Sequence, residues 1–172
     1  EDPLFESNAI AEYLDDVVAP RSHPDDAFKR ARNRAWTDFV PDFSKGINIY
    51  YTKTREEFDE KLAGAPKFLQ KLEDAIANER DNDGPYFNGP ELCLVDAAYA
   101  PFLQRFAMIE EIVQTGILAD YPLIKAWSDA LLANDAVIGS VAPSFEEVFF
   151  ANLKNRGFYV GTLLGDKVAA AE

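Results

Sequence analysis

The apolar residues of this 172-residue chain recur mostly at helical spacing, and the first such run lies close to its beginning. Its members fall at i, i+3, i+4, i+7 and i+8, which is one face of an α-helix; they are Ile10, Tyr13, Leu14, Val17 and Val18. Ahead of this run, residues 3–5 are typical of a short edge strand, because Pro3 gives no ladder donor. Ser7 stands where a helix N-cap is expected. The pattern predicts one strand that turns directly into one helix.

The rest of the chain predicts an all-helical body of about five helices. Residues 20–25 form a linker, because Pro20 and Pro24 break any helix and favour extended backbone. A long helix begins at residue 25 or 26, and Pro41 should bend or end it. Further helices follow, the last from about residue 144. Their signals are a capping box at Thr54 and Glu57, a break at residues 64–66, a turn at residues 81–85, a kink at Pro101 and a helix start at Tyr121-Pro122.

Two residues at the first turn point to chemistry. The free backbone amides of a helix start, together with the Ser7 hydroxyl, bind a carboxylate or phosphate. Glu6, directly ahead, adds a negative charge that could receive an ammonium group. Side by side, the two suit the zwitterionic end of an amino acid. The alternative is that Ser7 only caps the helix and Glu6 is a solvated charge.

Composition excludes several classes of protein. The formal net charge is −13, from 17 basic and 30 acidic side chains, which disfavours nucleic acid and anionic membranes as partners. The single cysteine rules out an internal disulfide framework and fits a reducing compartment. There is no apolar run of membrane-span length and no signal peptide, so a cytoplasmic protein is expected. His23, alone in the linker, is expected at the surface, and no metal site is predicted.

Residues 5–14 resemble the glutathione transferase pattern of Glu-Ser, a variable residue, Ala-Ile and then Tyr-Leu. In that family the acid-serine pair holds the γ-glutamyl end of glutathione, which implies this role for Glu6 and Ser7. A second match, residues 87–96, resembles the capping box of the family's C-terminal domain. The Asp96 carboxylate should reach back to the N-cap amide. Cys93 stands where the family usually has Ser or Thr, and a thiol is a weak acceptor, so only the Asp96 half should be strong.

The resemblance extends through most of the chain and implies an architecture. Residues 96–105, with a helical proline and a following arginine, look like the omega-type branch, and Tyr121-Pro122 with Trp127 also resembles the family. In the family a thioredoxin-like domain precedes an all-helical one. Residues 1–19 would then be the last strand and helix of the first domain, residues 20–25 the linker, and residues 26–172 the all-helical C-terminal domain.

The resemblance also implies an activity for the intact protein. It would add the glutathione thiol to an electrophile, or reduce a mixed disulfide, with glutathione as a substrate and a homodimer as the assembly. The activating residue should lie in the preceding domain, so no catalytic residue is assigned here and this chain alone is expected to be inactive. Arg34, Trp36 and Arg105 are candidates for the co-substrate pocket. The alternatives are a core position for Trp36 and a salt bridge for Arg105.

Three features of the sequence allow more than one interpretation. Cys93 could be a nucleophile only with a base or helix start beside it, and a substituted, buried cap is favoured. The basic residues between positions 29 and 34 are either a solvated helix face or part of a subunit interface. Finally, transferase-like helical domains also serve as non-catalytic docking or dimerisation modules, as in a subunit of translation elongation factor one-B, and a helical binding domain unrelated to the family is a further alternative.

Overall fold

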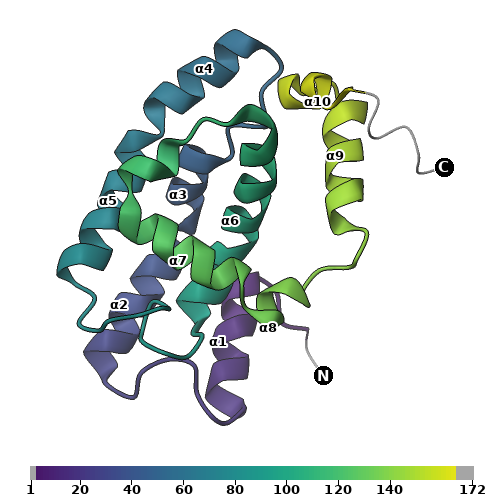
Figure 1. The fold of residues 1–172 in the computed structure, drawn as a ribbon. Coiled ribbons are helices and arrows are strands. Elements are labelled where there is room, and N and C mark those ends of the chain that lie inside the picture. The colour runs from purple at the N-terminus through teal and green to yellow at the C-terminus, as the bar shows by residue number, and fades with distance from the viewer. Residues whose placement is uncertain (1–2, 166–172) are drawn as a thin grey trace.

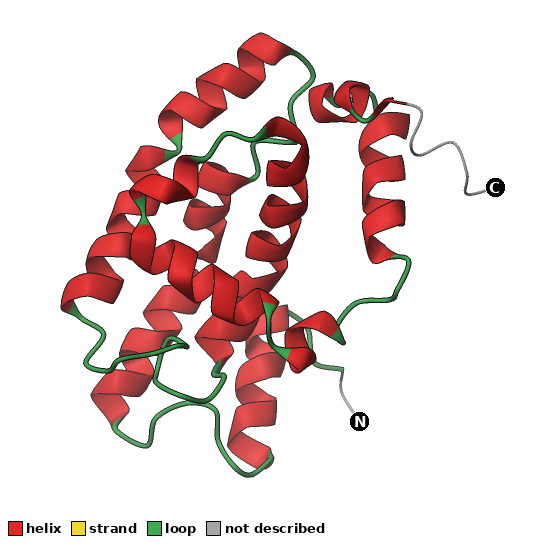
Figure 2. Cartoon of the chain, in the orientation of Figure 1, coloured by secondary structure: helices red, strands yellow, loops and turns green. Residues whose placement is uncertain are grey.

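The computed structural model describes residues 3–165, and over this range the chain is built of helices (Figure 1). In chain order they are α1 (Ser7–Val17), α2 (Ala27–Asp38), α3 (Val40–Ile47), α4 (Arg55–Gly64), α5 (Pro66–Asn78), α6 (Leu94–Val113), the 3₁₀ helix η1 (Ile117–Asp120), α7 (Pro122–Leu132), α8 (Asp135–Ile138), α9 (Phe145–Asn155) and α10 (Tyr159–Leu163). Figure 2 shows helices joined by loops, with no strand in the described part of the chain. The predicted all-helical body is confirmed.

Local sequence signals set most helix ends. The side chains of Asp26 and Thr54 each accept a backbone amide of the first turn, and they begin α2 and α4 respectively. Pro41 lies in the first turn of α3 and Pro66 opens α5, since proline is tolerated where no intrahelical N–H is needed. The predicted breaks at these two prolines are confirmed, whereas α8, α10 and η1 were not predicted.

Helix α6 forms the centre of the bundle. It packs against α2, α3 and α7, and α5 in turn packs against α3 and α7. The largest fully buried side chains are aromatic: Trp127, Tyr50, Tyr99, Phe43 and Phe106. Burying one such side chain is worth roughly 1.5–3 kcal/mol, so this aromatic core supplies a large part of the driving force for folding.

The start of the chain differs from the prediction in two ways. Residues 3–5 have no regular secondary structure, so the predicted edge strand is absent from the described residues, and residues 1–2 lie outside them. Helix α1 begins at Ser7 itself, and Glu6 is the N-cap residue, so the prediction of Ser7 as N-cap is wrong by one position. No other strand lies among residues 3–165 to serve as a ladder partner, and a single strand is not stable by itself.

Helix α1 lies on the bundle with its polar face inward. Its apolar residues are exposed, with Leu14 at 51% and Val17 at 57%, and its one buried residue is Asp15. The predicted apolar face therefore exists, but nothing in residues 3–165 covers it. The loop between α1 and α2, residues 18–26, contains residues 20–25. The proposed end of the C-terminal domain, residues 166–172, lies outside the described residues.

Candidate functional site

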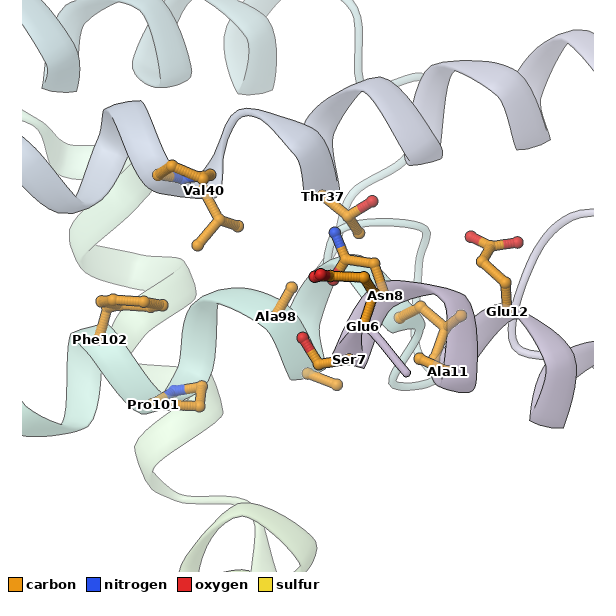
Figure 3. Close-up of a pocket in the computed structure, with 13 residues that line it drawn as sticks. Glu6, Ser7, Asn8, Ala11, Glu12, Thr37, Val40, Ala98, Pro101 and Phe102 are labelled. Atoms are coloured by element: carbon orange, nitrogen blue, oxygen red, sulfur yellow. The ribbon is translucent and has the colours of Figure 1, made fainter. Parts of the chain in front are cut away.

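A cleft of about 560 Å³ lies between α1, the junction of α2 and α3, and α6 (Figure 3). The polar side of the cleft comes from α1 and from Glu6 just before it. The opposite side is apolar and is formed by Val40 and Pro41 of α3 and by Pro101 and Phe102 of α6. The full lining is Glu6, Ser7, Asn8, Ala11, Glu12, Thr37, Val40, Pro41, Leu94, Ala97, Ala98, Pro101 and Phe102.

Glu6 and Ser7, which the sequence singled out, lie together at this cleft. In Figure 3 both side chains project toward the stretch of α6 that carries Ala98 and Pro101. Glu6 has φ 67° and ψ 119°, a backbone conformation that side-chain-bearing residues rarely adopt. Such a conformation costs about 1–3 kcal/mol and is found mostly at functional sites. The sequence offered no signal for it, since glycine is the usual residue at positive φ.

Two carboxylates line the cleft, and their surroundings differ. Glu12 has both oxygens engaged: Oε1 lies 2.8 Å from His23 Nε2, and Oε2 accepts from Arg34 Nε at 2.7 Å and lies 2.6 Å from Nη2. Burial by itself would raise the pKa of Glu12, but these two partners outweigh it and the pKa lies below its usual value. Among residues 3–165, no hydrogen bond or ion pair engages the Glu6 carboxylate. Glu6 is therefore the carboxylate that a ligand's ammonium group can reach.

The apolar side of the cleft complements this polar corner. Pro101 sits inside α6, where it removes one backbone donor from the helix. The neighbouring Phe102 ring and the side chain of Val40 complete the wall in Figure 3. A cleft with a few polar groups at one end and an apolar wall at the other suits a ligand of mixed character.

The three predicted co-substrate residues do not line this cleft. Trp36 is 7% exposed and its ring packs edge-on against Phe39, because α2 turns Thr37 toward the cleft and Trp36 into the core. This is the core position given above as the alternative. Arg34 is absent from the lining of the cleft and is bound to Glu12.

The third candidate, Arg105, forms a hydrogen bond within its own helix, α6. Its Nη1 donates to the Pro101 carbonyl at 2.6 Å, and its guanidinium lies 4.9 Å from the centre of the Phe145 ring. No ion pair to Arg105 is found among residues 3–165, so the salt bridge considered as its alternative is not seen there.

The capping box at the start of α6 has the expected strong half. Asp96 Oδ2 accepts from the Cys93 amide at 2.8 Å, while the Cys93 thiol occupies the weaker, forward half of the box. Asp96 also does more than was predicted: its Oδ1 accepts from the Phe87 amide at 2.9 Å and from Trp127 Nε1 at 2.6 Å. Burial and the nearby Asp96 charge raise the pKa of the Cys93 thiol, so it is a structural cap and a poor nucleophile.

His23 is buried, and its expected surface position is wrong. The side chain is enclosed between α1 and α2, where Nε2 lies 2.8 Å from Glu12 Oε1 and Nδ1 lies 3.4 Å from Asn33 Nδ2. Both partners are ten or more positions away along the chain, so no local pattern pointed to them.

The basic run on α2 is also satisfied within the chain. Each of its four residues has an acceptor of its own, which favours neither a purely solvated face nor a dedicated subunit contact. The pairs are Lys29 with Asp81, Arg30 with the carbonyls of Pro24 and Asp25, Arg32 with the carbonyl of Glu79, and Arg34 with Glu12.

Known proteins resemble this chain in sequence. Residues 55–130 match the family model described as the glutathione S-transferase C-terminal domain. Glutathione S-transferase U22 of Arabidopsis thaliana is 28% identical over 153 residues, which is 87% of this chain and 67% of that protein.

Solved structures give the same result. Glutathione transferase Omega 3C from Trametes versicolor superposes with a TM-score of 0.71 at 25% identity, over 89% of this chain and 66% of that one. The Tau class enzyme of mango, Mangifera indica, has the same fold, with a TM-score of 0.70 at 23% identity over 88% of this chain and 71% of that one.

The chain thus spans about two thirds of the length of these relatives. Omega and Tau proteins both occur among its structural neighbours, so the omega-type branch is not singled out. No helix among residues 3–165 is long and apolar enough to cross a membrane. Residues 55–130 thus resemble the glutathione S-transferase C-terminal domain, and the described residues have the fold of that helical domain.

Proposed function

We propose that the intact protein is a glutathione transferase, and that this chain supplies one end of its glutathione site and the wall for its co-substrate. The observation that carries the proposal is the position of Glu6 and Ser7 at the mouth of a cleft whose far side is apolar. The Glu6 carboxylate would receive the α-ammonium of the γ-glutamyl group. The Ser7 hydroxyl and the first amides of α1 would receive its carboxylate.

The chemistry that the relatives' names imply needs a group to activate the glutathione thiol. Cys93 is unsuitable because its thiol is buried and its pKa is raised. We therefore propose that the activating residue belongs to a preceding thioredoxin-like domain, of which residues 1–19 form the last part. The exposed apolar face of α1 supports this division, since such a face suits a covering layer. Residues 20–25 would be the linker and residues 26–172 the C-terminal domain.

The co-substrate and the assembly are inferred from the relatives rather than from the cleft. The co-substrate would be an electrophile, or a mixed disulfide if the protein follows the omega-type branch that the sequence around Pro101 resembles. The assembly would be a homodimer, which sedimentation of the protein can test. The cleft favours an enzyme over the docking-module alternative, because a docking module has no need of an unpaired carboxylate beside a helix start.

The test is a titration of the chain with glutathione, followed by the backbone amide resonances of Ser7 and Asn8. We expect weak but saturable binding, with a dissociation constant on the order of 1 mM. Glu6→Gln should weaken it roughly tenfold, because a charge-assisted hydrogen bond is lost. N-acetylglutathione, which lacks the ammonium group, should bind the native chain no better than glutathione binds the variant.

Glu111→Gln is the matched control, since Glu111 is an acidic residue on α6 remote from this cleft. Its affinity for glutathione should equal that of the native chain. The assigned role of Glu6 is contradicted if N-acetylglutathione binds the native chain as tightly as glutathione does. It is also contradicted if Glu6→Gln and Glu111→Gln lose affinity for glutathione equally. A conjugation assay with the chain alone should show no turnover.

A further inference from the structure

The attachment of α1 to the bundle is unusual, because it depends on polar contacts. The apolar side chains of the helix point away from the bundle, and its one buried residue is an aspartate. Asp15 Oδ1 accepts from the backbone amides of Ser22 at 2.5 Å and His23 at 3.3 Å. These two bonds fix the loop that follows α1. The angle of the helix over the cleft must be set by other contacts.

Glu12 makes the contacts that join α1 directly to α2. Its Oε2 accepts from Arg34 Nε at 2.7 Å and lies 2.6 Å from Arg34 Nη2, and its Oε1 lies 2.8 Å from the ring of the buried His23. Asn33 in turn faces the other nitrogen of that ring at 3.4 Å, so the imidazole is held on both sides. Two nitrogens of the planar Arg34 guanidinium, Nε and Nη2, converge on the same oxygen, Glu12 Oε2, and together they restrain the pair more than a single contact would.

The geometry links this cluster to the ligand corner. Glu12 and Ser7 lie on the same short helix, five residues or about 7.5 Å apart along its axis. An α-helix of this length moves as a rigid rod on the scale of a cleft, so an anchor at Glu12 sets where Ser7 lies. The remaining polar contact near that end, Asn8 Nδ2 to Asp38 Oδ1, is 3.5 Å long and exposed.

We propose that Glu12, held by Arg34 and His23, is a positioning residue that fixes α1, and with it the Glu6–Ser7 corner, over the cleft. Glu12 lines the cleft, but both of its carboxylate oxygens are already engaged, Oε1 by His23 and Oε2 by Arg34. Its contribution is to hold the polar wall at a set distance from the apolar one. The inference depends on the proposed function only for what the corner binds, and the position of α1 can be measured without any ligand.

The experiment measures amide hydrogen exchange of the 172-residue chain, comparing α1 with α6. Arg34→Gln should speed exchange in α1 about fivefold relative to α6, as expected for a half-exposed ion pair of about 1 kcal/mol. Glu12→Gln should have a similar effect, and the double variant should be no worse than the more affected single one. Arg34→Lys should restore part of the protection, since lysine keeps the charge without the fork.

Arg32→Gln is the matched control, because Arg32 lies on the same helix and donates to the Glu79 carbonyl instead. It should leave α1 unchanged. The inference is overturned if the Glu12 and Arg34 variants do not affect α1, if α1 and α6 change equally, or if α1 is unprotected in the native chain. If these effects appear but glutathione does not bind, the proposed function fails and the positioning role stands.

Discussion

At the residue scale, Asp96 is the buried polar side chain with the most hydrogen bonds among residues 3–165. It is fully buried and accepts three hydrogen bonds, from the cap of α6, from the loop before it and from Trp127 of α7. Asp96→Ala leaves three buried donors without a partner, each costing about 1–3 kcal/mol. We expect the free energy of unfolding to fall by about 3 kcal/mol or more in urea denaturation.

Asp129→Ala is the control for this substitution. Asp129 is exposed and forms an i,i+4 pair with Lys125 on α7, which is worth at most about 0.5 kcal/mol. A loss no larger for Asp96→Ala than for Asp129→Ala would mean that the buried donors find other partners.

The buried Cys93 gives a second prediction at this scale. Burial raises the pKa of its thiol, so the thiolate is scarce at neutral pH and the sulfur is shielded. We expect the folded chain to react with a disulfide reagent at neutral pH at least about a hundredfold more slowly than the chain in urea. Equal rates in the two states would contradict the role of Cys93 as an enclosed cap and reopen its candidacy as a nucleophile.

What the sequence could predict at this scale depended on how local the interaction is. The Asp96 half of the capping box joins residues three apart, and it was predicted correctly. His23 was placed at the surface because its partners Glu12 and Asn33 come from two different helices. The strained backbone at Glu6 had no signal at all, since a strained conformation is imposed by the surrounding structure and not by the residue itself.

At the scale of the element, the attachment of α1 should depend on pH through Glu12. The pKa of this carboxyl lies below its usual value in the folded chain, because the Arg34 and His23 bonds outweigh the effect of burial. Its contribution is therefore complete above the unfolded value of about 4.3, and it is lost as the pH falls through the lower folded value. Hydrogen exchange in α1 relative to α6 should therefore become faster as the pH falls below the unfolded value.

The control for this prediction is Glu12→Gln, which has no proton to gain at that position. Its α1 should exchange faster at neutral pH and show no further step on acidification. A step of equal size in this variant would assign the pH dependence to another carboxyl near Arg34, such as Asp15 or Asp16, which both lie on α1.

Element boundaries were predicted well wherever a proline or a capping side chain set them, as at Pro41, Thr54 and Pro66. The orientation of α1 was not predicted. Its period of 3.6 correctly gave one apolar face, yet periodicity alone does not say which layer covers that face. In this chain the polar side of α1 meets the bundle, because Glu12 and Asp15 have partners there. The absent strand at residues 3–5 has the same origin, since a strand needs a neighbour.

At the scale of the whole molecule, the outward face of α1 is a contiguous apolar stripe on a strongly acidic protein. Its members are Ile10, Tyr13, Leu14, Val17 and Val18, each at least 37% exposed. A stripe of this kind on an otherwise charged surface marks an interaction site. The stripe should therefore bind small amphiphiles in solution.

We therefore expect the chain to enhance the fluorescence of an anilinonaphthalene sulfonate dye, and the double variant Leu14→Lys, Val17→Lys to lose about half of that signal. Val148→Lys is the control, because Val148 is 61% exposed on α9, away from the stripe. Urea unfolding should be unchanged in all variants, since none of these side chains is buried. If Val148→Lys lowers the signal as much as the double variant does, the dye is reporting some other surface, and the outward face of α1 loses its support as the contact for a preceding domain.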